Sequence, residues 1–230
     1  MNLDLLDFTP PPLDLGLEPD DSQEDHEPPS SRCAGCKGEG GQARALKRET
    51  RHVYRRAFSE TRLLDLLERD FTPGASYHVI SGGDIDSLSY LKHVLRQQPL
   101  DYCLFSTWCM ASEDVAQFSG WIDEGKIGRL DAYCGEIFPG SYRKQHAELK
   151  EVILRNGGRL AIFQNHSKIY AGVGPRFAFA IESSANINTN PRTENSAIHV
   201  GDDVFLFYKA FFDGVKSYAR DFDEWKPWEP

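Results

Sequence analysis

The sequence lacks any apolar run long enough to cross a membrane, and no basic stretch followed by an apolar one opens it. A membrane-spanning helix needs about 20 consecutive, mostly apolar residues, and a secretory signal needs both stretches. We therefore expect no membrane insertion and a cytoplasmic location.

Cysteine is also scarce: the chain has five in 230 residues. This odd number fits reduced thiols better than a disulfide framework. Cys103, Cys109 and Cys134 stand among apolar residues and are expected to lie in the core.

Lys and Arg are missing from the first 31 positions, which carry nine Asp and Glu. The whole chain has 26 basic and 35 acidic residues, so its net charge of −9 comes from this segment and residues 32–230 are balanced. Residues 1–42 also contain six prolines, and we predict a disordered acidic tail there. A balanced body is compatible with a polyanionic partner, because local basic patches create the binding field. The acidic tail can mimic such a partner and cover a basic groove.

A second C-x-x-C is missing as well. Cys33 and Cys36 have the spacing of half a zinc site, with His26 and His52 as the nearest completing ligands. Two interpretations stay open: incidental cysteines, which the absence of a second pair favours, or a metal site.

Residues 43–70 are predicted to form a basic amphipathic helix. Its apolar positions recur near a period of 3.6, and its arginines fall on another face. That stripe is either an ordinary solvated face or a surface for phosphate-backbone contact. The arginines of the stripe that we name as substrate-binding candidates are Arg48, Arg51 and Arg55.

Strand-like and helix-like segments alternate over residues 71–222, and residues 223–230 form a C-terminal tail. The pattern predicts strands at 77–81, 101–107, 129–134, 159–165, 167–171, 177–181 and 197–200, and helices at 85–95, 113–124, 142–156 and 203–220. Such alternation predicts an α/β sandwich with a mixed, largely parallel sheet flanked by helices.

Two of the apolar runs end in polar clusters. One holds His166 and Lys168, and the other holds Ser183, Ser184 and Asn186. Alternate side chains of a strand share a face, so the imidazole and the ammonium are expected to point the same way. An imidazole next to an ammonium suits phosphate chemistry, which needs a nucleophile, a proton donor and cations around the phosphoryl oxygens.

At these residues the sequence resembles the phospholipase D superfamily, whose signature is H-x-K, an Asp a few residues later, and a G-S-x-N-like turn. His166 and Lys168 match the first part, Ser184 and Asn186 match the last, and Val173 stands where the family has its Asp. The resemblance covers about residues 70–220 and implies a phospholipase D-like fold. Because the chain has one H-x-K, the resemblance also implies a homodimer that places two copies of the motif together.

The resemblance implies roles for the site residues. His166 would attack phosphorus to form a phosphohistidine while His166 of a second copy protonates the leaving oxygen. Lys168 would hold the non-bridging oxygens, with hydrogen bonds from Ser184 and Asn186. Glu182 or, preferably, Glu194 would orient the imidazole in place of the missing Asp. The scheme uses no metal and no cofactor.

A third cluster, Arg143, Lys144 and His146, begins the helix predicted after the third strand. It either lines a substrate groove, because backbone amides at a helix start also favour anions, or is plain surface charge.

The chain is therefore predicted to be a metal-independent nuclease of the phospholipase D type, with nucleic acid as partner. The alternatives are a catalytically inactive nucleic-acid-binding module, and a hydrolase of lipids or small phosphodiesters.

Overall fold

The computed structural model describes residues 51–67, 69–187, 192–218 and 225–230, and only the backbone of 51–58. The chain divides into two units, Met1–Leu46 and Lys47–Pro230, and every described residue belongs to the second. The predicted acidic tail, Cys33, Cys36 and Arg48 lie outside the described residues. No helix among those described is long and apolar enough to cross a membrane.

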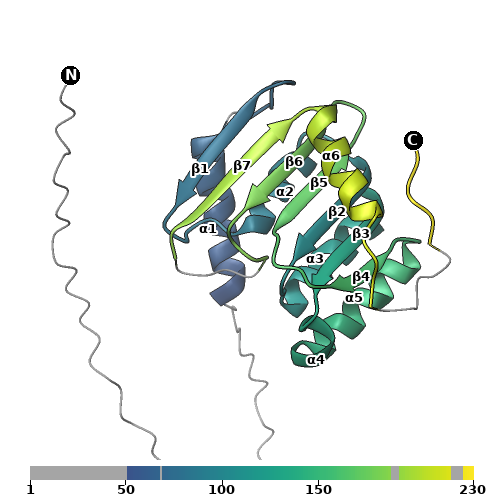
Figure 1. Cartoon of the computed structure of the whole chain (residues 1–230). Coiled ribbons are helices and arrows are strands. Elements are labelled where there is room, and N and C mark those ends of the chain that lie inside the picture. The colour runs from purple at the N-terminus through teal and green to yellow at the C-terminus, as the bar shows by residue number, and fades with distance from the viewer. Residues whose placement is uncertain (1–50, 68, 188–191, 219–224) are drawn as a thin grey trace, which may run out of the picture. The chain divides into compact units, whose positions relative to one another are not determined.

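The second unit is built on one seven-stranded sheet with the order β1-β7-β6-β5-β2-β3-β4 (Figure 1). The strands are β1 (Ser76–Ser81), β2 (Leu100–Thr107), β3 (Ile127–Gly135), β4 (Leu160–Phe163), β5 (Ile169–Val173), β6 (Ala178–Ser183) and β7 (Glu194–Val200). Most of their residues are apolar and buried, as expected for strands covered on both faces.

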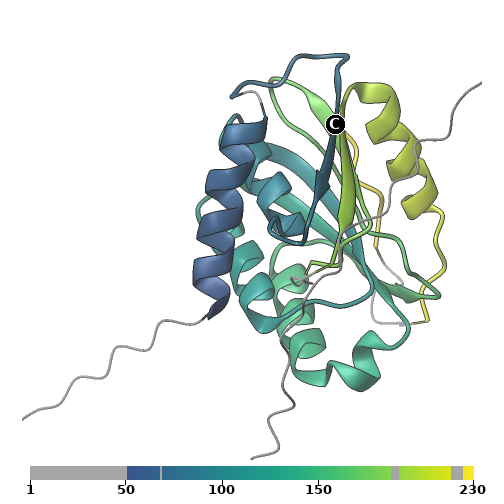
Figure 2. The same ribbon diagram turned by 90° about the vertical axis from the view of Figure 1, so that its left-hand side faces the viewer.

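Helices cover both faces of this sheet (Figure 2). They are α1 (Arg51–Leu66), α2 (Ser87–Leu95), α3 (Ser112–Asp123), the one-turn α4 (Phe138–Ser141), α5 (Arg143–Arg155) and α6 (Asp202–Asp213). One core lies beneath α1 to α5, and a second, smaller core lies beneath α6. The predicted α/β class, with a mixed sheet flanked by helices, is confirmed.

The prediction of a largely parallel sheet is wrong. Only the β2–β3 and β3–β4 pairs are parallel, and the four pairs β1–β7, β2–β5, β5–β6 and β6–β7 are antiparallel. The physical reason is the length of the connections. Parallel neighbours need a crossover, which α3 and α5 supply, whereas only residues 174–177 lie between β5 and β6, which is too short for a crossover and fits an antiparallel pair.

Several predicted boundaries also differ. The helix predicted at 203–220 ends at Asp213, because Gly214 follows and the next residues turn back toward β4, where the Tyr218 amide donates to the Ile162 carbonyl. The strand predicted at 167–171 begins only at Ile169. The C-terminal tail lies over the second core: the Trp228 ring stacks on Tyr102 with centroids 5.0 Å apart, and Arg159 lies 4.3 Å above the Trp225 ring.

Candidate functional site

One end of the sheet gathers the polar clusters noted in the sequence. Five strands finish at this end: the parallel strands β2, β3 and β4, and also β1 and β6. Strands β5 and β7 begin at the same end. Their position follows from the paired residues Ser106↔Ile169, Ile169↔Glu182 and Ser81↔Glu194. We call this end of the sheet the site end. In open α/β sheets the carboxyl ends of parallel strands are the usual place for ligands. The N-termini of α2, α3 and α5 follow these strands and add partial positive charge.

The loop between β4 and β5 is held in place by Asn165, a buried residue. Its amide nitrogen donates to the Ser106 hydroxyl at 2.9 Å and to the Tyr133 carbonyl at 3.0 Å. Its side-chain oxygen accepts from the amide and the hydroxyl of Ser167. Residues 164–168 are not part of a strand, although the Lys168 carbonyl accepts from the Ser183 amide at 3.0 Å, so His166 and Lys168 stand in a loop and not on a strand face as expected.

His166 and Lys168 nevertheless lie together. The Lys168 ammonium is 2.9 Å from Nδ1 of His166 and also donates to the His166 carbonyl at 2.5 Å. The imidazole is exposed, whereas Lys168 is only 8% exposed. Among the described residues, no carboxylate hydrogen-bonds the His166 ring. Lys168 is therefore the hydrogen-bond partner of the ring in the described part of the chain.

Burial lowers the pKa of Lys168 below the usual lysine range, because desolvation disfavours the ammonium; nearby Cys109 and Glu194 oppose this effect. The ammonium is held by a carbonyl and an imidazole nitrogen, neither of which carries a negative charge. A phosphoryl group would supply the missing anion. The site is thus arranged to favour a negatively charged ligand at Lys168.

A pocket of about 490 Å³ opens at this place, on the sheet face that carries α6. Its lining residues come from the β4–β5 loop and from β6 and β7, and include His166, Lys168, Glu182, Ser184 and Asn195. Ser184 donates a short hydrogen bond to the Glu194 carboxylate and accepts one from the Asn195 amide at 3.0 Å. Glu194 thus contacts Ser184 and acts on Lys168 by its charge, which is a different position from the imidazole-orienting one expected.

Glu182, the other carboxylate considered, is held from α6. Its Oε1 accepts from the Tyr208 hydroxyl at 2.5 Å and lies 3.9 Å from Nε2 of His199. Burial, followed by this hydrogen bond to Glu182, raises the pKa of Tyr208. Tyr208 therefore stays protonated and acts as the donor to Glu182.

Two predicted positions lie away from the pocket. Asn186 accepts through its carbonyl from the Ser87 hydroxyl at the start of α2, and its side-chain oxygen is buried without a hydrogen-bond partner. Val173, at the position of the family's Asp, is at the far end of β5 beside Trp228, in a separate cavity. Five residues of strand separate it from Lys168, which is about 16 Å. A carboxylate at this position would therefore not reach the His166 ring.

The structure adds Trp108, which the sequence did not single out. It directly follows β2, and its ring centroid lies 5.5 Å from that of His166 at an angle of 57°. Gly135, the last residue of β3, makes room for it: a Cβ there would lie 2.7 Å from Cδ1 of Trp108 and 2.9 Å from the Asn165 carbonyl. The signal in the sequence is a Trp at the end of one parallel strand and a Gly at the end of the next.

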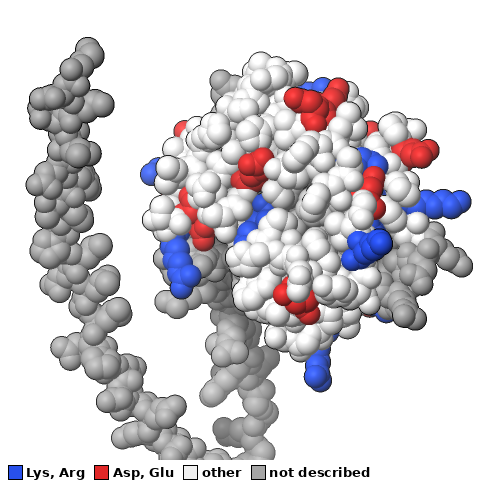
Figure 3. All heavy atoms as spheres, in the orientation of Figure 1, with Lys and Arg blue, Asp and Glu red and all other residues white. Residues whose placement is uncertain are grey.

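The remaining cationic candidates are spread out. Arg143 and Lys144 are exposed at the start of α5, while the His146 ring packs edge-on to buried Phe138. For Arg51 and Arg55 only the backbone is described. On the face that carries α6, basic and acidic side chains of the described residues are interspersed (Figure 3). Affinity for an anion on this face therefore depends on local groups such as Lys168.

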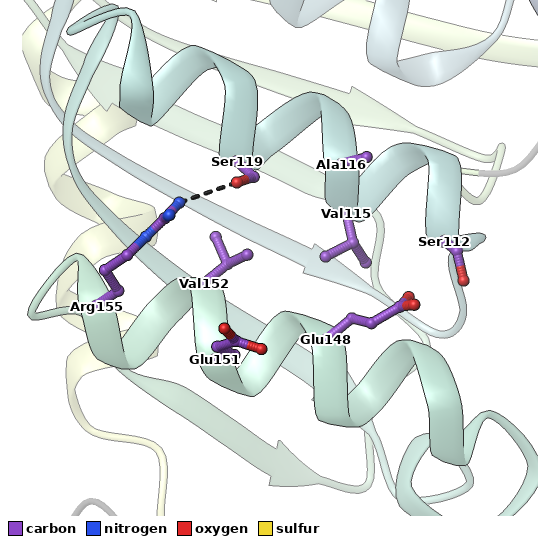
Figure 4. A pocket seen from close by; sticks show the side chains of 8 residues that line it. All are labelled: Ser112, Val115, Ala116, Ser119, Glu148, Glu151, Val152 and Arg155. Carbon is purple, nitrogen blue, oxygen red and sulfur yellow. Dashed lines mark hydrogen bonds between the residues drawn. The ribbon is translucent and has the colours of Figure 1, made fainter.

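A second groove of about 270 Å³ lies between α3 and α5 (Figure 4). Val115 and Val152 form its apolar part, and Glu148 and Arg155 stand at its sides. It contains none of the predicted site residues. Within the described ranges, no three His, Cys, Asp or Glu side chains are grouped so that they can hold a metal ion.

Comparison with solved structures gives a weak likeness. The chain is similar to a polyphosphate kinase from Porphyromonas gingivalis, with a TM-score of 0.47 and 14% identity over 64% of this chain and 27% of the kinase chain. The chain thus spans about a quarter of that protein. A likeness of this size assigns neither a family nor an activity. No protein-family model matches the chain, and no curated protein matches it.

Proposed function

We propose that this chain is a phosphodiesterase of the phospholipase D type, acting on nucleic acid through His166. The observation that carries the proposal is the contact of 2.9 Å between the Lys168 ammonium and the His166 ring, in a pocket that also holds Ser184. These groups match the functions that phosphoryl transfer needs, which are a nucleophile, a cation and hydrogen-bond donors around the phosphoryl oxygens.

The chemistry runs in two displacements. A His166 ring nitrogen attacks phosphorus and the bond to the leaving oxygen breaks, and that oxygen takes a proton from His166 of a second copy of the chain. Water, deprotonated by the second imidazole, then attacks phosphorus and breaks the P–N bond. The second copy is needed because the described pocket holds one imidazole, whereas the scheme uses one as nucleophile and one as acid.

The contact between Lys168 and the ring supports a starting state for His166. The Lys168 ammonium lies 2.9 Å from Nδ1 and 3.4 Å from Nε2 of His166, and in our scheme it donates to the nearer nitrogen, so that the neutral ring carries its proton on Nε2. When a phosphate binds, the ammonium turns to the phosphoryl oxygens and releases Nδ1. We infer that substrate binding and the change of His166 from proton donor to nucleophile are coupled through Lys168.

Hydrolysis of single-stranded oligonucleotides, measured with EDTA present, tests this function. We expect cleavage that His166→Ala and Lys168→Ala each reduce by at least about 1,000-fold, because both remove groups acting on the transferred phosphoryl group. Lys226→Ala, at an exposed lysine of the C-terminal tail, is the matched control and should retain full activity. Cleavage that requires Mg²⁺, or that survives in His166→Ala, would contradict the mechanism.

The dimer is tested separately by light scattering of the full chain across a range of concentrations. We expect activity per chain to fall on dilution as dimers dissociate. A monomer with undiminished activity would refute the shared site and leave only a single-chain mechanism.

The alternative function is an inactive binding module. Tight oligonucleotide binding without any cleavage would favour it over the nuclease.

A further inference from the structure

Trp108 is an aromatic side chain beside the reacting group with no place in the chemistry described so far. It is half-buried and follows the last residue of β2, and its ring lies 5.5 Å from the exposed imidazole of His166. The fold keeps space for it, since a Cβ on Gly135 would come within 2.7 Å of the indole. The ends of two parallel strands, β2 and β3, therefore hold the indole in a defined position at the site.

We propose that Trp108 is the stacking platform for a nucleobase of a single-stranded nucleic acid, next to the phosphate bound by Lys168. The proposal rests on the proposed function of His166 and names the substrate that this site would take. One sugar joins a base to its phosphate, so a base stacked on the indole keeps its phosphate close to the neighbouring imidazole. Stacking on an aromatic side chain contributes about 1–3 kcal/mol per base and tolerates any sequence.

The surroundings favour a base over a lipid chain. An acyl chain or a bilayer surface needs a continuous apolar patch. Among the described residues, the strongly exposed Leu206, Phe207 and Phe211 lie together on α6, whereas the pocket at His166 is lined mainly by polar side chains. Exposed Arg143, which begins α5 after the neighbouring strand β3, adds positive charge at this end of the sheet, whereas Lys144 lies 3.7 Å from the Glu148 carboxylate.

A single strand is favoured over a duplex for two reasons. In a duplex the bases are stacked and paired, so their faces are not available to an indole without unstacking, which costs a few kcal/mol. Basic and acidic side chains are interspersed on the face that carries α6 (Figure 3), so the described part of that face offers no continuous basic surface for both strands of a duplex.

Binding measured without turnover tests the stacking directly. The protein is the full chain carrying His166→Asn, alone or combined with Trp108→Ala or Trp108→Phe. The probes are a fluorescent oligo(dT) and an oligomer of equal length in which abasic sugars replace the nucleosides. We expect Trp108→Ala to weaken oligo(dT) binding by about 5- to 150-fold, the equivalent of about 1–3 kcal/mol, and Trp108→Phe to retain most of it.

Binding of the abasic oligomer should be the same in all three proteins, which also shows that the Trp108 variants are folded. Trp228→Phe, at the far end of the sheet, is the matched aromatic control and should change neither affinity. The proposal is overturned if Trp108→Ala weakens both probes equally, if it weakens neither, or if oligo(dT) does not bind. It is also overturned if Trp108 is needed for binding to phosphatidylcholine vesicles and not to oligo(dT).

These outcomes are independent of hydrolysis. Binding is measured in the His166→Asn background, where we expect no turnover, so a failure of catalysis in the wild-type chain leaves the stacking result standing. Conversely, wild-type cleavage of oligonucleotides that is unaffected by Trp108→Ala would support the proposed function and overturn the stacking platform.

Discussion

At the scale of single residues, the pair His166 and Lys168 is the part of the site that the sequence located best. The order H-x-K was enough to expect an imidazole beside an ammonium, and the structure places these groups 2.9 Å apart. The expected reason was a shared strand face, whereas the actual reason is a loop fixed by Asn165. A short motif can thus identify a pair of side chains although the local backbone differs from the one assumed.

Lys168 leads to a prediction about pH. Its folded pKa is lowered from the ordinary value of 10.5, mainly by burial. The protonated form binds phosphate, so activity should be present below the lowered pKa and be lost as the pH rises through it, before an ordinary lysine would deprotonate. Lys168→Arg keeps its charge at high pH. In the wild type, kcat/KM should fall at alkaline pH; in Lys168→Arg, the remaining activity should not show this fall. If both proteins show the same fall, deprotonation of Lys168 is not its cause.

Gly135 gives a second prediction at this scale. Gly135→Ala places a methyl group 2.7 Å from Trp108 and 2.9 Å from the Asn165 carbonyl, so backbone or indole must shift. We expect a loss of about 1–3 kcal/mol of unfolding free energy, measured by urea denaturation, together with reduced activity. Gly120→Ala on α3 is the matched control, because a Cβ there meets nothing within 4 Å. Equal unfolding free energies of the two variants would show that the packing of Trp108 against Gly135 is not close enough to exclude a methyl group.

At the scale of elements, α6 has two apolar sides. Phe205 and Phe212 are buried against the sheet, and the Phe212 ring lies 4.6 Å from Tyr133. Leu206, Phe207 and Phe211 are 56–67% exposed on the outer side. A helical hydrophobic pattern in the sequence indicates that such a helix exists, but a helix that is apolar on two sides does not indicate which side faces the sheet.

Two phenylalanines of α6 test this assignment. Phe212→Ala removes a ring that is 1% exposed and should cost about 3–5 kcal/mol of unfolding free energy, whereas Phe207→Ala, at 67% exposed, should stay within about 0.5 kcal/mol of the wild type. Both are measured by urea denaturation of the same preparation. If Phe207→Ala were the more destabilising of the two, α6 would be oriented the other way.

At the scale of the whole molecule, the separation of charge along the chain is the main feature of the sequence. Residues 1–31 carry nine acidic side chains and no Lys or Arg, so we predict that they repel a polyanion and compete with it for basic groups. Deleting residues 1–42 should therefore raise the affinity for oligonucleotides by about 5-fold or more at low salt, and the difference should shrink as salt screens it.

Fluorescence anisotropy with labelled oligo(dT) measures this effect. The matched control is the full-length chain in which those nine acids are replaced by Asn or Gln, which keeps the length and removes the charge. It should bind as tightly as the deletion variant. Unchanged affinity in both proteins would mean that the acidic segment does not cover the site.

The sequence by itself determined the α/β class, the existence of most strands and helices, and the identity of His166, Lys168 and Ser184 as neighbours. Hydrophobic periodicity and the order of a short motif are local properties, so one chain is enough to reveal them. Only the tertiary structure decided the four antiparallel strand pairs, the distance of Val173 and Asn186 from the pocket, and the contact of Trp108 with His166. Strand direction and pairing across the sheet are set by contacts between segments far apart in the chain.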